Sequence, residues 1–391
     1  MLRDMTNTPY QKSQGPLYLL VHSDHYHDIH GPNSGAEMAS LNQARALAKA
    51  GRRVCLAARL KEPVAIDRGV EFFDLGAEYR VESALDWADS QGRYVLVAAG
   101  KSFALMLSRR HTQCIRRLLV THDRSAGDSG LKPDVLEHMC DHVLCVSEAQ
   151  REKLALEGIP PKLLSVIHNG VDFEIFRPVQ PELHNPRRLV FSGALVPDKG
   201  LHLLLGSFVT LLPAFPDLEI DIFGSASLWS RDDYLDLPGI MAAVPGVHFH
   251  GKATQSRIAQ AMGRAGICVV PSIWFDPYPL TSLEAQACGC PVAAFRVGGL
   301  PEGIAHNSTG VIIDTVSEEA LTQTLRELIS DPQRLHVMSE AALAWSHRNF
   351  DWQDVAKKII RAAEPSLSFP SLGAASAAFQ LGTPGTLAND Q

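Results

Sequence analysis

The sequence lacks several features that would point to particular classes of protein. It has no long run of lysine or arginine, and its 36 Lys+Arg residues are outnumbered by 43 Asp+Glu, so the net charge is −7. Because binding to nucleic-acid phosphates depends on clustered positive charge, we do not expect nucleic acid as a partner. No stretch approaches the roughly 20 apolar residues needed to span a bilayer, and the polar start MLRDMTNTPYQKSQG has no apolar core of a secretion signal. We therefore expect a cytoplasmic protein.

Two further motifs are absent. No Gly-x-Gly-x-x-Gly follows the first predicted strand, so the sequence disfavours an NAD-dependent oxidoreductase. Seven cysteines cannot all pair, and the one close pair, Cys288 and Cys290, has no second pair with which to form a zinc site. Because most of the seven lie within apolar runs, we expect buried free thiols.

What the sequence does contain is a regular alternation of short apolar runs with helix-length amphipathic stretches. Near-continuous apolar runs are typical of parallel strands covered on both faces, and their alternation with helices predicts βαβ units. A helix is expected from Ala36 to Ala50, followed by Gly51 where a residue of positive φ belongs. The predicted strands begin at Leu17, Val54, Tyr94, Leu118, His142 and Leu163, and then at Arg188, Leu218, Val247, Ile267, Pro291 and Thr309. Two such series predict an α/β protein with two doubly wound, Rossmann-like domains.

A stretch without apolar periodicity separates the two series. The segment FRPVQPELHNPRR, which begins at Phe176, contains three prolines and suits an inter-domain linker. We therefore predict a first domain over residues 1–183 and a second over residues 184–345. A helix over residues 346–365 is expected to pack back toward the first domain. Residues 366–391, rich in Ser, Ala, Gly, Thr and Pro, are expected to form a mobile tail.

The segment Pro271–Ile304 carries the most informative side chains. It reads as strand, loop, helix, strand and Gly-Gly loop, with Asp276 on the first loop and Glu284 near the helix start. The backbone N–H groups of Leu280 and Thr281 would be unpaired at that start, where the helix dipole also favours negative charge. A carboxylate one turn further on can accept hydrogen bonds from a vicinal diol such as a ribose. A nucleotide sugar offers phosphate, diol and hydroxyls together.

The segment follows the pattern acid-x7-Glu-Ala-x-Ala-x-Gly-x-Pro-Val-x-Ala-x-x-x-Gly-Gly-x-x-Glu, which ends with Gly298, Gly299 and Glu302. In this it resembles the retaining family-4 glycosyltransferases of the GT-B fold. The resemblance extends over roughly residues 17–350 and implies two Rossmann-like domains that face a central cleft. Four more family landmarks occur in order: Ser34-Gly35-Ala36-Glu37, Thr121-His122-Asp123, Val146-Ser147-Glu148 with Asn169-Gly170-Val171-Asp172, and FSGALVPDKG from Phe191 to Gly200.

The resemblance implies roles for four side chains. Lys199 is expected to reach a diphosphate between the domains and to stabilise the charge of the leaving group. Glu284 is expected to bind the ribose of the donor, and Asp276 either to contact the sugar or to cap its own loop. His122 is expected to face the donor sugar. No residue is assigned as a general base, because retention in this family is usually explained without a protein nucleophile, with a phosphate oxygen taking the proton.

The resemblance also implies backbone contacts with substrate. Gly35 precedes the first helix, where the chain must approach a phosphate or an acceptor closely, although a plain tight turn is the alternative. No metal site is expected, because no Asp-x-Asp follows a strand and the loop HSDHYHDIH, His22–His30, lacks the spacing of a known zinc helix. The other expected substrate-binding residues are Gly193, Gly224, Leu280, Thr281, Gly298 and Gly299.

Two departures from the family pattern occur at positions where the family usually has a charged residue. Where the family usually has arginine after the glycine of the FSG segment, this chain has Ala194, and where it commonly has glutamate, this chain has Asp276. Lys199 then binds the diphosphate alone with the helix dipole, or another cation replaces the arginine. The candidates for that replacement are Arg124, Arg231 and Arg296.

The implied activity is transfer of a sugar from a nucleotide-diphosphate sugar to a hydroxyl of a carbohydrate, lipid-linked or small-molecule acceptor, without a cofactor. A GT-B sugar-nucleotide epimerase or phosphorylase is an alternative, and a non-catalytic nucleotide-sugar-binding protein is another. The presence of Lys199 and Glu284 opposes the last, whereas Ala194 and Asp276 leave it open. A peripheral membrane contact through Arg109, Arg110, Arg116 and Arg117 is a further alternative, although a solvated helix end is favoured.

Overall fold

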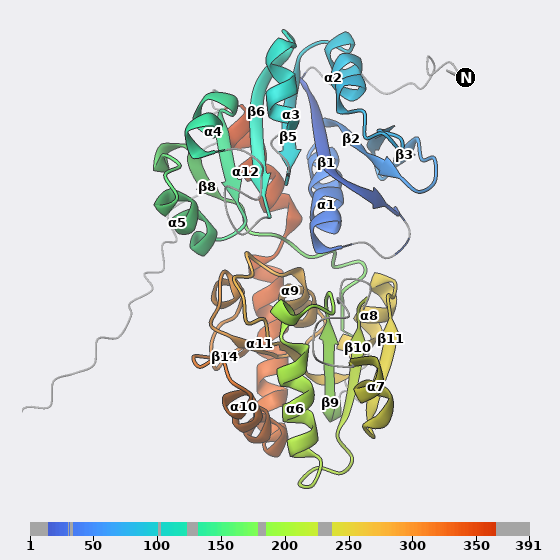
Figure 1. Ribbon diagram of the computed structural model, residues 1–391, viewed down its shortest axis with the longest axis vertical. Helices are drawn as coiled ribbons and strands as arrows, with labels where there is room; N and C mark the ends of the chain where they lie inside the picture. Colours follow the sequence, from blue (N-terminus) through green and yellow to red (C-terminus); the bar gives the residue numbers. More distant parts are fainter. Residues whose placement is uncertain are drawn as a thin grey trace, which may run out of the picture.

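The structure is a computed structural model that describes residues 15–29, 31, 34–100, 103–122, 132–178, 185–225 and 237–364. It consists of two halves, each built on a mainly parallel β-sheet with helices on both faces (Figure 1). This is the α/β architecture that the alternation of strands and helices predicts. The predicted domain boundary between residues 183 and 184 and the predicted tail over residues 366–391 lie outside the described residues.

The first half contains a sheet of eight strands in the order β3-β4-β2-β1-β5-β6-β7-β8. Its strands are β1 Leu17–His27, β2 Arg53–Leu60, β3 Ile66–Asp67, β4 Val70–Asp74, β5 Tyr94–Ala99, β6 Cys114–Thr121, β7 His142–Cys145 and β8 Leu164–Val166. All neighbours pair in parallel except β3 and β4. The sequence reading missed β3 and β4, because β3 has two residues and β4 alternates between buried and less buried positions.

The second half contains a wholly parallel sheet in the order β11-β10-β9-β12-β13-β14. Its strands are β9 Asn185–Ser192, β10 Glu219–Phe223, β11 Val247–Gly251, β12 Ala265–Val270, β13 Val292–Phe295 and β14 Gly310–Ile313. In both sheets the strand order reverses beside the first strand, since β1 lies between β2 and β5 and β9 lies between β10 and β12. Ligands of open α/β sheets bind at the carboxyl ends of the strands next to such a reversal.

Each sheet is buried on both faces by helices. Helices α1 and α12 share one apolar cluster with the first sheet, and helices α2 to α5 share the cluster on its other face. In the second half, α8 and α9 cover one face, and α6, α10 and α11 the other. The helices are α1 Gly35–Lys49, α2 Val81–Ser90, α3 Phe103–Leu107, α4 Pro133–Met139, α5 Glu148–Leu156, α6 Leu201–Leu211, α7 Leu237–Ala243, α8 Gln255–Met262, α9 Leu280–Ala287, α10 Glu318–Ser330, α11 Pro332–Asn349 and α12 Trp352–Ala363.

Helix α1 shows how local sequence sets both ends of an element. Ser34 accepts a hydrogen bond from the backbone of Glu37, whose carboxylate accepts one from the backbone of Ser34 at 2.6 Å. This capping box satisfies two backbone donors at the start of the helix. Gly51, just after the end of α1, has φ +79°, as the sequence predicts. The capped end of α1 faces the second half (Figure 1).

Helix α12 follows the second half in sequence but packs on α1 of the first half (Figure 1). Its apolar side, which includes Val355 and Ile359, is buried in the cluster that α1 shares with the first sheet. Beyond its end, the carboxylate of Glu364 accepts a hydrogen bond from the hydroxyl of Tyr18 at 2.5 Å and pairs with Arg52 at 3.1 Å. The last described helix therefore completes the core of the first half.

The structure also bears on the class of protein. All seven cysteines are buried free thiols, as the sequence predicts. Within the described ranges, no helix combines the length and the apolar character that crossing a membrane requires.

Candidate functional site

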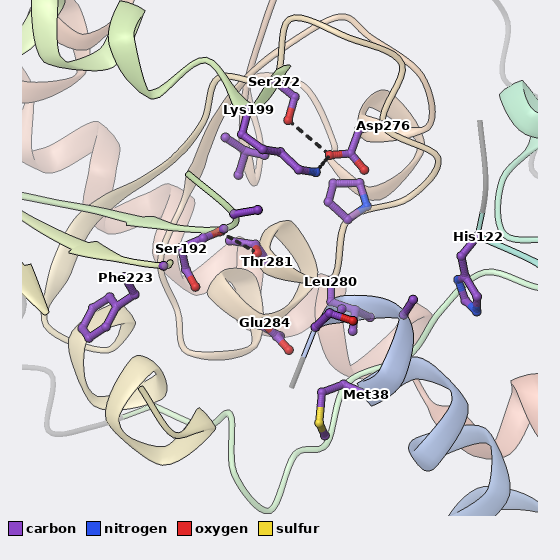
Figure 2. A pocket seen from close by; sticks show the side chains of 18 of the residues that line it. Met38, His122, Ser192, Lys199, Phe223, Ser272, Asp276, Leu280, Thr281 and Glu284 are labelled. Atoms are coloured by element: carbon purple, nitrogen blue, oxygen red, sulfur yellow. Dashed lines mark hydrogen bonds and ion pairs between the residues drawn. The ribbon is translucent and has the colours of Figure 1, made fainter. Parts of the chain in front are cut away.

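A cleft of about 1360 Å³ lies between the two halves, at the carboxyl ends of their strands. Its walls come from the ends of β1, β6 and β7 in the first half and of β9 to β12 in the second. Figure 2 shows side chains from both walls pointing into this space. Nine of the predicted site residues line it: Gly35, His122, Gly193, Lys199, Gly224, Asp276, Leu280, Thr281 and Glu284.

Lys199 is held in place by close contacts between the turn that it closes and the residues that follow β12. It closes a 3₁₀ turn, Pro197–Lys199, and Gly200 follows with φ +68°. A Cβ atom on Gly200 would lie 1.8 Å from the carbonyl oxygen of Pro271, just after β12, so only glycine fits there. The backbone N–H of Ile273 also donates to the carbonyl of Asp198 at 2.9 Å. These contacts hold Lys199 beside the loop that follows β12.

That loop carries the partner of Lys199. The ammonium of Lys199 forms an ion pair with Oδ2 of Asp276, and the hydroxyl of Ser272 donates to the same oxygen at 3.2 Å (Figure 2). Asp276 is 7% exposed, whereas the side chain of Lys199 is 34% exposed and reaches the cleft. The two predicted charged residues therefore contact each other.

Gly298 and Gly299 lie behind the same loop and are not among the residues that line the cleft. The backbone N–H of Gly299 donates to the carbonyl of Asp276 at 2.8 Å. A Cβ atom on Gly298 would lie 2.1 Å from that carbonyl oxygen, and one on Gly299 would lie 2.0 Å from the carbonyl oxygen of Pro277. The structure thus places both glycines as spacers for the loop, and their predicted contact with substrate stays a prediction.

The start of α9 forms the next part of the second-half wall. Leu280 and Thr281 are its first two residues, and the preceding Pro279 provides no side-chain cap. The hydroxyl of Thr281 donates to the carbonyl of Ser192 at 3.0 Å, which ties the helix start to the end of β9. The free N–H groups at this helix start form an environment that favours an anion.

Glu284 lies one turn further along α9 with its carboxyl group toward the cleft (Figure 2). Burial raises the pKa of Glu284 to about 8. Desolvation favours the neutral form of a carboxyl group, so much of Glu284 carries a proton at neutral pH. A protonated carboxyl group can donate one hydrogen bond as well as accept others.

His122 and Gly35 lie on the opposite wall. His122 follows β6, and its Nε2 finds no hydrogen-bond partner among the described residues. Burial lowers the pKa of His122 to about 4, so its imidazole is neutral at neutral pH. Gly35 begins α1, and a Cβ atom there would meet nothing within 4 Å. The first-half wall therefore presents the neutral imidazole of His122 and, at Gly35, a stretch of backbone that no neighbouring atoms crowd.

Two glycine turns line the cleft where β9 and β10 end. The N–H of Gly193 donates to the carbonyl of Phe223 at 3.0 Å. A Cβ atom on Gly224 would lie 2.0 Å from the carbonyl oxygen of Gly193, so the two turns are in direct contact. Close packing between the turns accounts for glycine at position 224.

Family models cover most of the described chain. The model "Glycosyl transferases group 1" matches residues 172–345, and the model "Glycosyltransferase Family 4" matches residues 33–175. The chain belongs to the group 1, family-4 glycosyltransferases. The two matches follow the two halves of the structure and together include every cleft-lining residue except Tyr26.

The relatives of this glycosyltransferase chain differ in name. The D-inositol 3-phosphate glycosyltransferase of Thermobispora bispora is 30% identical over 230 residues, which are 55% of this chain and 53% of that protein. The GDP-mannose-dependent alpha-(1-6)-phosphatidylinositol monomannoside mannosyltransferase of Mycolicibacterium smegmatis is 28% identical over 233 residues, 54% of this chain and 59% of that protein. The chain thus spans about half the length of these curated relatives.

Solved structures show that the fold is shared. HepE of Anabaena, solved in complex with UDP-glucose, has a TM-score of 0.71 and covers 88% of this chain and 98% of its own, at 19% identity. The neighbours of this fold are GT-B glycosyltransferases. The GT-B fold expected from the sequence is confirmed.

The glycosyltransferase chain has Ala194 where its family usually has arginine, and the expected replacements do not supply the missing charge within the described residues. Arg124 and Arg231 lie outside those residues. Arg296 does not line the cleft and instead contacts Asp314 at 2.5 Å. The sequence reading missed three lysines that do line the cleft, namely Lys61, Lys153 and Lys252. Lys252 directly follows β11, so its place at a strand end was the signal that could have revealed it.

The remaining polar features of the sequence are engaged elsewhere. His22 contacts the hydroxyl of Ser40 at 2.8 Å, whereas His30 and the side chain of His25 lie outside the description. No group of three metal-ligand residues occurs in the part of the chain that was described. The four predicted surface arginines contact protein groups, in the pairs Arg109 with the His138 carbonyl, Arg110 with Glu82, Arg116 with Asp141 and Arg117 with Ser108.

Proposed function

We propose that this family member transfers a sugar from a nucleotide-diphosphate sugar to a hydroxyl group of an acceptor, with retention of anomeric configuration and without a metal ion. One observation carries the proposal: Lys199, the open start of α9 and Glu284 gather on one wall of a single cleft. An ammonium with free backbone N–H groups complements a diphosphate, and a carboxyl group complements a ribose diol.

The proposed reaction needs charge stabilisation and positioning more than a protein base. As the bond between the anomeric carbon and the diphosphate oxygen breaks, negative charge grows on the diphosphate, where Lys199 and the start of α9 stabilise it. The acceptor oxygen bonds to the anomeric carbon on the same face, and its proton passes to a phosphate oxygen of the leaving group. Neutral His122, from the opposite wall, hydrogen-bonds to the transferred sugar and holds it in place.

The proposed donors are nucleoside diphosphate hexoses. HepE was solved in complex with UDP-glucose and the mannosyltransferase relative is named as GDP-mannose-dependent, so these two nucleotide sugars are the first pair to test. The acceptor is proposed to lie against the first-half wall and to be a carbohydrate or glycoconjugate, since that wall presents an open backbone at Gly35 beside polar side chains.

A thermal-shift screen with UDP, GDP, UDP-glucose and GDP-mannose tests donor binding first, because a bound ligand raises the unfolding temperature. Transfer is then followed as release of the nucleoside diphosphate in the presence of candidate acceptors. We expect Lys199→Ala and Glu284→Ala to lower turnover about 100-fold or more. Lys162→Ala and Glu152→Ala are matched controls on the exposed surface of the first half, and both should behave like the wild type.

The finer parts of the proposal have their own measurements. NMR of the product reports whether the new glycosidic bond keeps the configuration of the donor. Full activity in EDTA is expected, and reversible loss of activity would show that a metal ion takes part. Near-wild-type turnover by both cleft variants would contradict the assignment of the site.

A further inference from the structure

Asp276 has a structural environment that suits a role other than binding sugar. Its Oδ2 already accepts hydrogen bonds from the ammonium of Lys199 and from the hydroxyl of Ser272, and its side chain is almost fully buried. Both partners of the carboxylate belong to the same half as Asp276 itself. These contacts of Oδ2 fix one position for the ammonium of Lys199.

The loop of Asp276 is held from behind and cannot easily move away from Lys199. Gly299 donates to the carbonyl of Asp276, and neither Gly298 nor Gly299 leaves room for the loop to shift toward them. Two residues later, the carbonyl of Tyr278 accepts a hydrogen bond from the buried side-chain amide of Asn169, which belongs to the first half. The backbone on both sides of the carboxylate is thus anchored.

An anchored partner matters for a lysine because its side chain is long and flexible. Ordering such a side chain costs conformational entropy. In this chain part of that cost is met on folding, because the ion pair with Asp276 already restricts the side chain of Lys199. The ammonium has three N–H donors, so two remain for a ligand when one is held by Asp276.

We propose that Asp276 is a positioning residue that holds Lys199 where the diphosphate of the donor binds. This inference rests on the proposed function, since it assumes that the cleft binds a nucleoside diphosphate. It differs from both roles expected from the sequence, sugar contact and loop capping. Glutamate at this position, the common family residue, would place its carboxylate one methylene further from the backbone.

The experiment compares ligands with and without sugar. Isothermal titration measures the dissociation constants of UDP and UDP-glucose, or of GDP and GDP-mannose, for the wild type and for Asp276→Asn. We expect the variant to bind the nucleoside diphosphate about tenfold more weakly, and the nucleotide sugar more weakly by the same factor. Charge alone would have the opposite effect, because removing a negative charge near a diphosphate strengthens binding. Weaker binding therefore reports on the position of Lys199.

A double-mutant cycle isolates the coupling between the two residues. In a Lys199→Met background, Asp276→Asn should no longer weaken binding, because there is no ammonium left to position. Asp276→Glu keeps a carboxylate for Lys199 and should recover part of the lost affinity, and it also serves if Asp276→Asn folds poorly. Asp314→Asn removes an exposed acid from the same half, outside the cleft, and should leave both dissociation constants unchanged.

Each alternative has a distinct result. An Asp276→Asn variant that binds the nucleoside diphosphate normally and only the nucleotide sugar weakly would show a sugar contact and overturn the positioning role. Stronger binding of both ligands, or additive effects in the cycle, would overturn it too. If the folded wild type binds none of the four nucleotides, the proposed function fails and this inference fails with it.

Discussion

The Nε2 atom of His168 and a carboxylate oxygen of Glu302 lie 3.0 Å apart across the boundary between the two halves. The same carboxylate accepts hydrogen bonds from the backbone N–H groups of Glu148 at 2.7 Å and Ala149 at 2.8 Å. These are the first two residues of α5, whose N–H groups have no partner within the helix. One side chain of the second half thus completes a helix end of the first.

Removing this side chain should destabilise the protein. We expect Glu302→Ala to lower the free energy of unfolding by about 2 kcal/mol, since several hydrogen bonds to one partly buried charge are lost. Urea denaturation followed by circular dichroism measures the change. Glu152→Ala, at an exposed position on α5, is the matched control and should stay within about 0.5 kcal/mol of the wild type. Equal stability of the two variants would show that the contact contributes nothing.

The same contact should depend on pH. Burial alone would raise the pKa of Glu302, but hydrogen bonds from His168 and the two backbone N–H groups lower it below its ordinary value of 4.5. Its contribution is therefore fully present above pH 4.5 and disappears as the pH falls through the lower pKa of the folded state. The stability difference between the wild type and Glu302→Gln, measured by urea denaturation from about pH 7 to about pH 3.5, should shrink toward acid. A difference that grows toward acid would contradict this assignment.

Glu284 should act on stability in the opposite sense. Its pKa is raised to about 8, so the folded protein holds this proton more tightly than the unfolded chain does. The stability that this tighter binding provides is full below pH 4.5 and is lost as the pH rises to about 8. Relative to the wild type, Glu284→Gln should therefore gain about 5 kcal/mol of stability between acidic and alkaline pH. A pH-independent difference between the two, measured by urea denaturation, would argue against a buried ionisable carboxyl group.

Donor binding should release a proton from Glu284. If a ribose diol donates hydrogen bonds to the carboxylate, the bound ligand favours the ionised form and lowers the pKa of Glu284. Titration of UDP or GDP near pH 7 in two buffers of different ionisation enthalpy counts the protons released. The wild type should release more protons than Glu284→Gln. Release of the same number of protons by the wild type and by Glu284→Gln would show that the ribose does not bind to Glu284.

Gly200 should not tolerate a side chain. Its positive φ is unfavourable for alanine, and the added Cβ would overlap the carbonyl of Pro271. We expect Gly200→Ala to cost about 3 kcal/mol of stability or more and to displace Lys199. Gly15→Ala, where nothing lies within 4 Å of the new Cβ, is the control and should change stability by less than about 0.5 kcal/mol. Equal thermal midpoints would show that the strand ends can separate without cost.

The fold could be predicted because several of its strands are continuous apolar runs in the sequence. Runs such as Tyr94–Ala99 and Ala265–Val270 are buried along their whole length. A near-continuous apolar run is the sequence pattern typical of a parallel strand that is covered on both faces. The strands β3 and β4 could not be found, because two residues carry no pattern and β4 lies near the sheet edge, where one side is less buried.

The sequence could predict which residues belong to the candidate site, but not which of them contact each other. The motifs named Lys199, Asp276 and Glu284, and the structure places all three on one cleft wall. The pairing of Lys199 with Asp276 joins positions 77 residues apart, so no local spacing reveals it. In the same way, sequence shows that Gly298 and Gly299 lack side chains, but only the fold shows that the Asp276 loop occupies that space.

The position of α12 has a consequence for how the chain is made. During synthesis, α1 and the first sheet emerge early, but the helix that covers them is formed by residues 352–363. The apolar face of α1 therefore stays uncovered until the whole second half has left the ribosome. A nascent first half is exposed to chaperones or to aggregation for that time. Gene fragments that end before α12 would lack part of the core of the first half, so we expect the first half expressed without α12 to fold poorly.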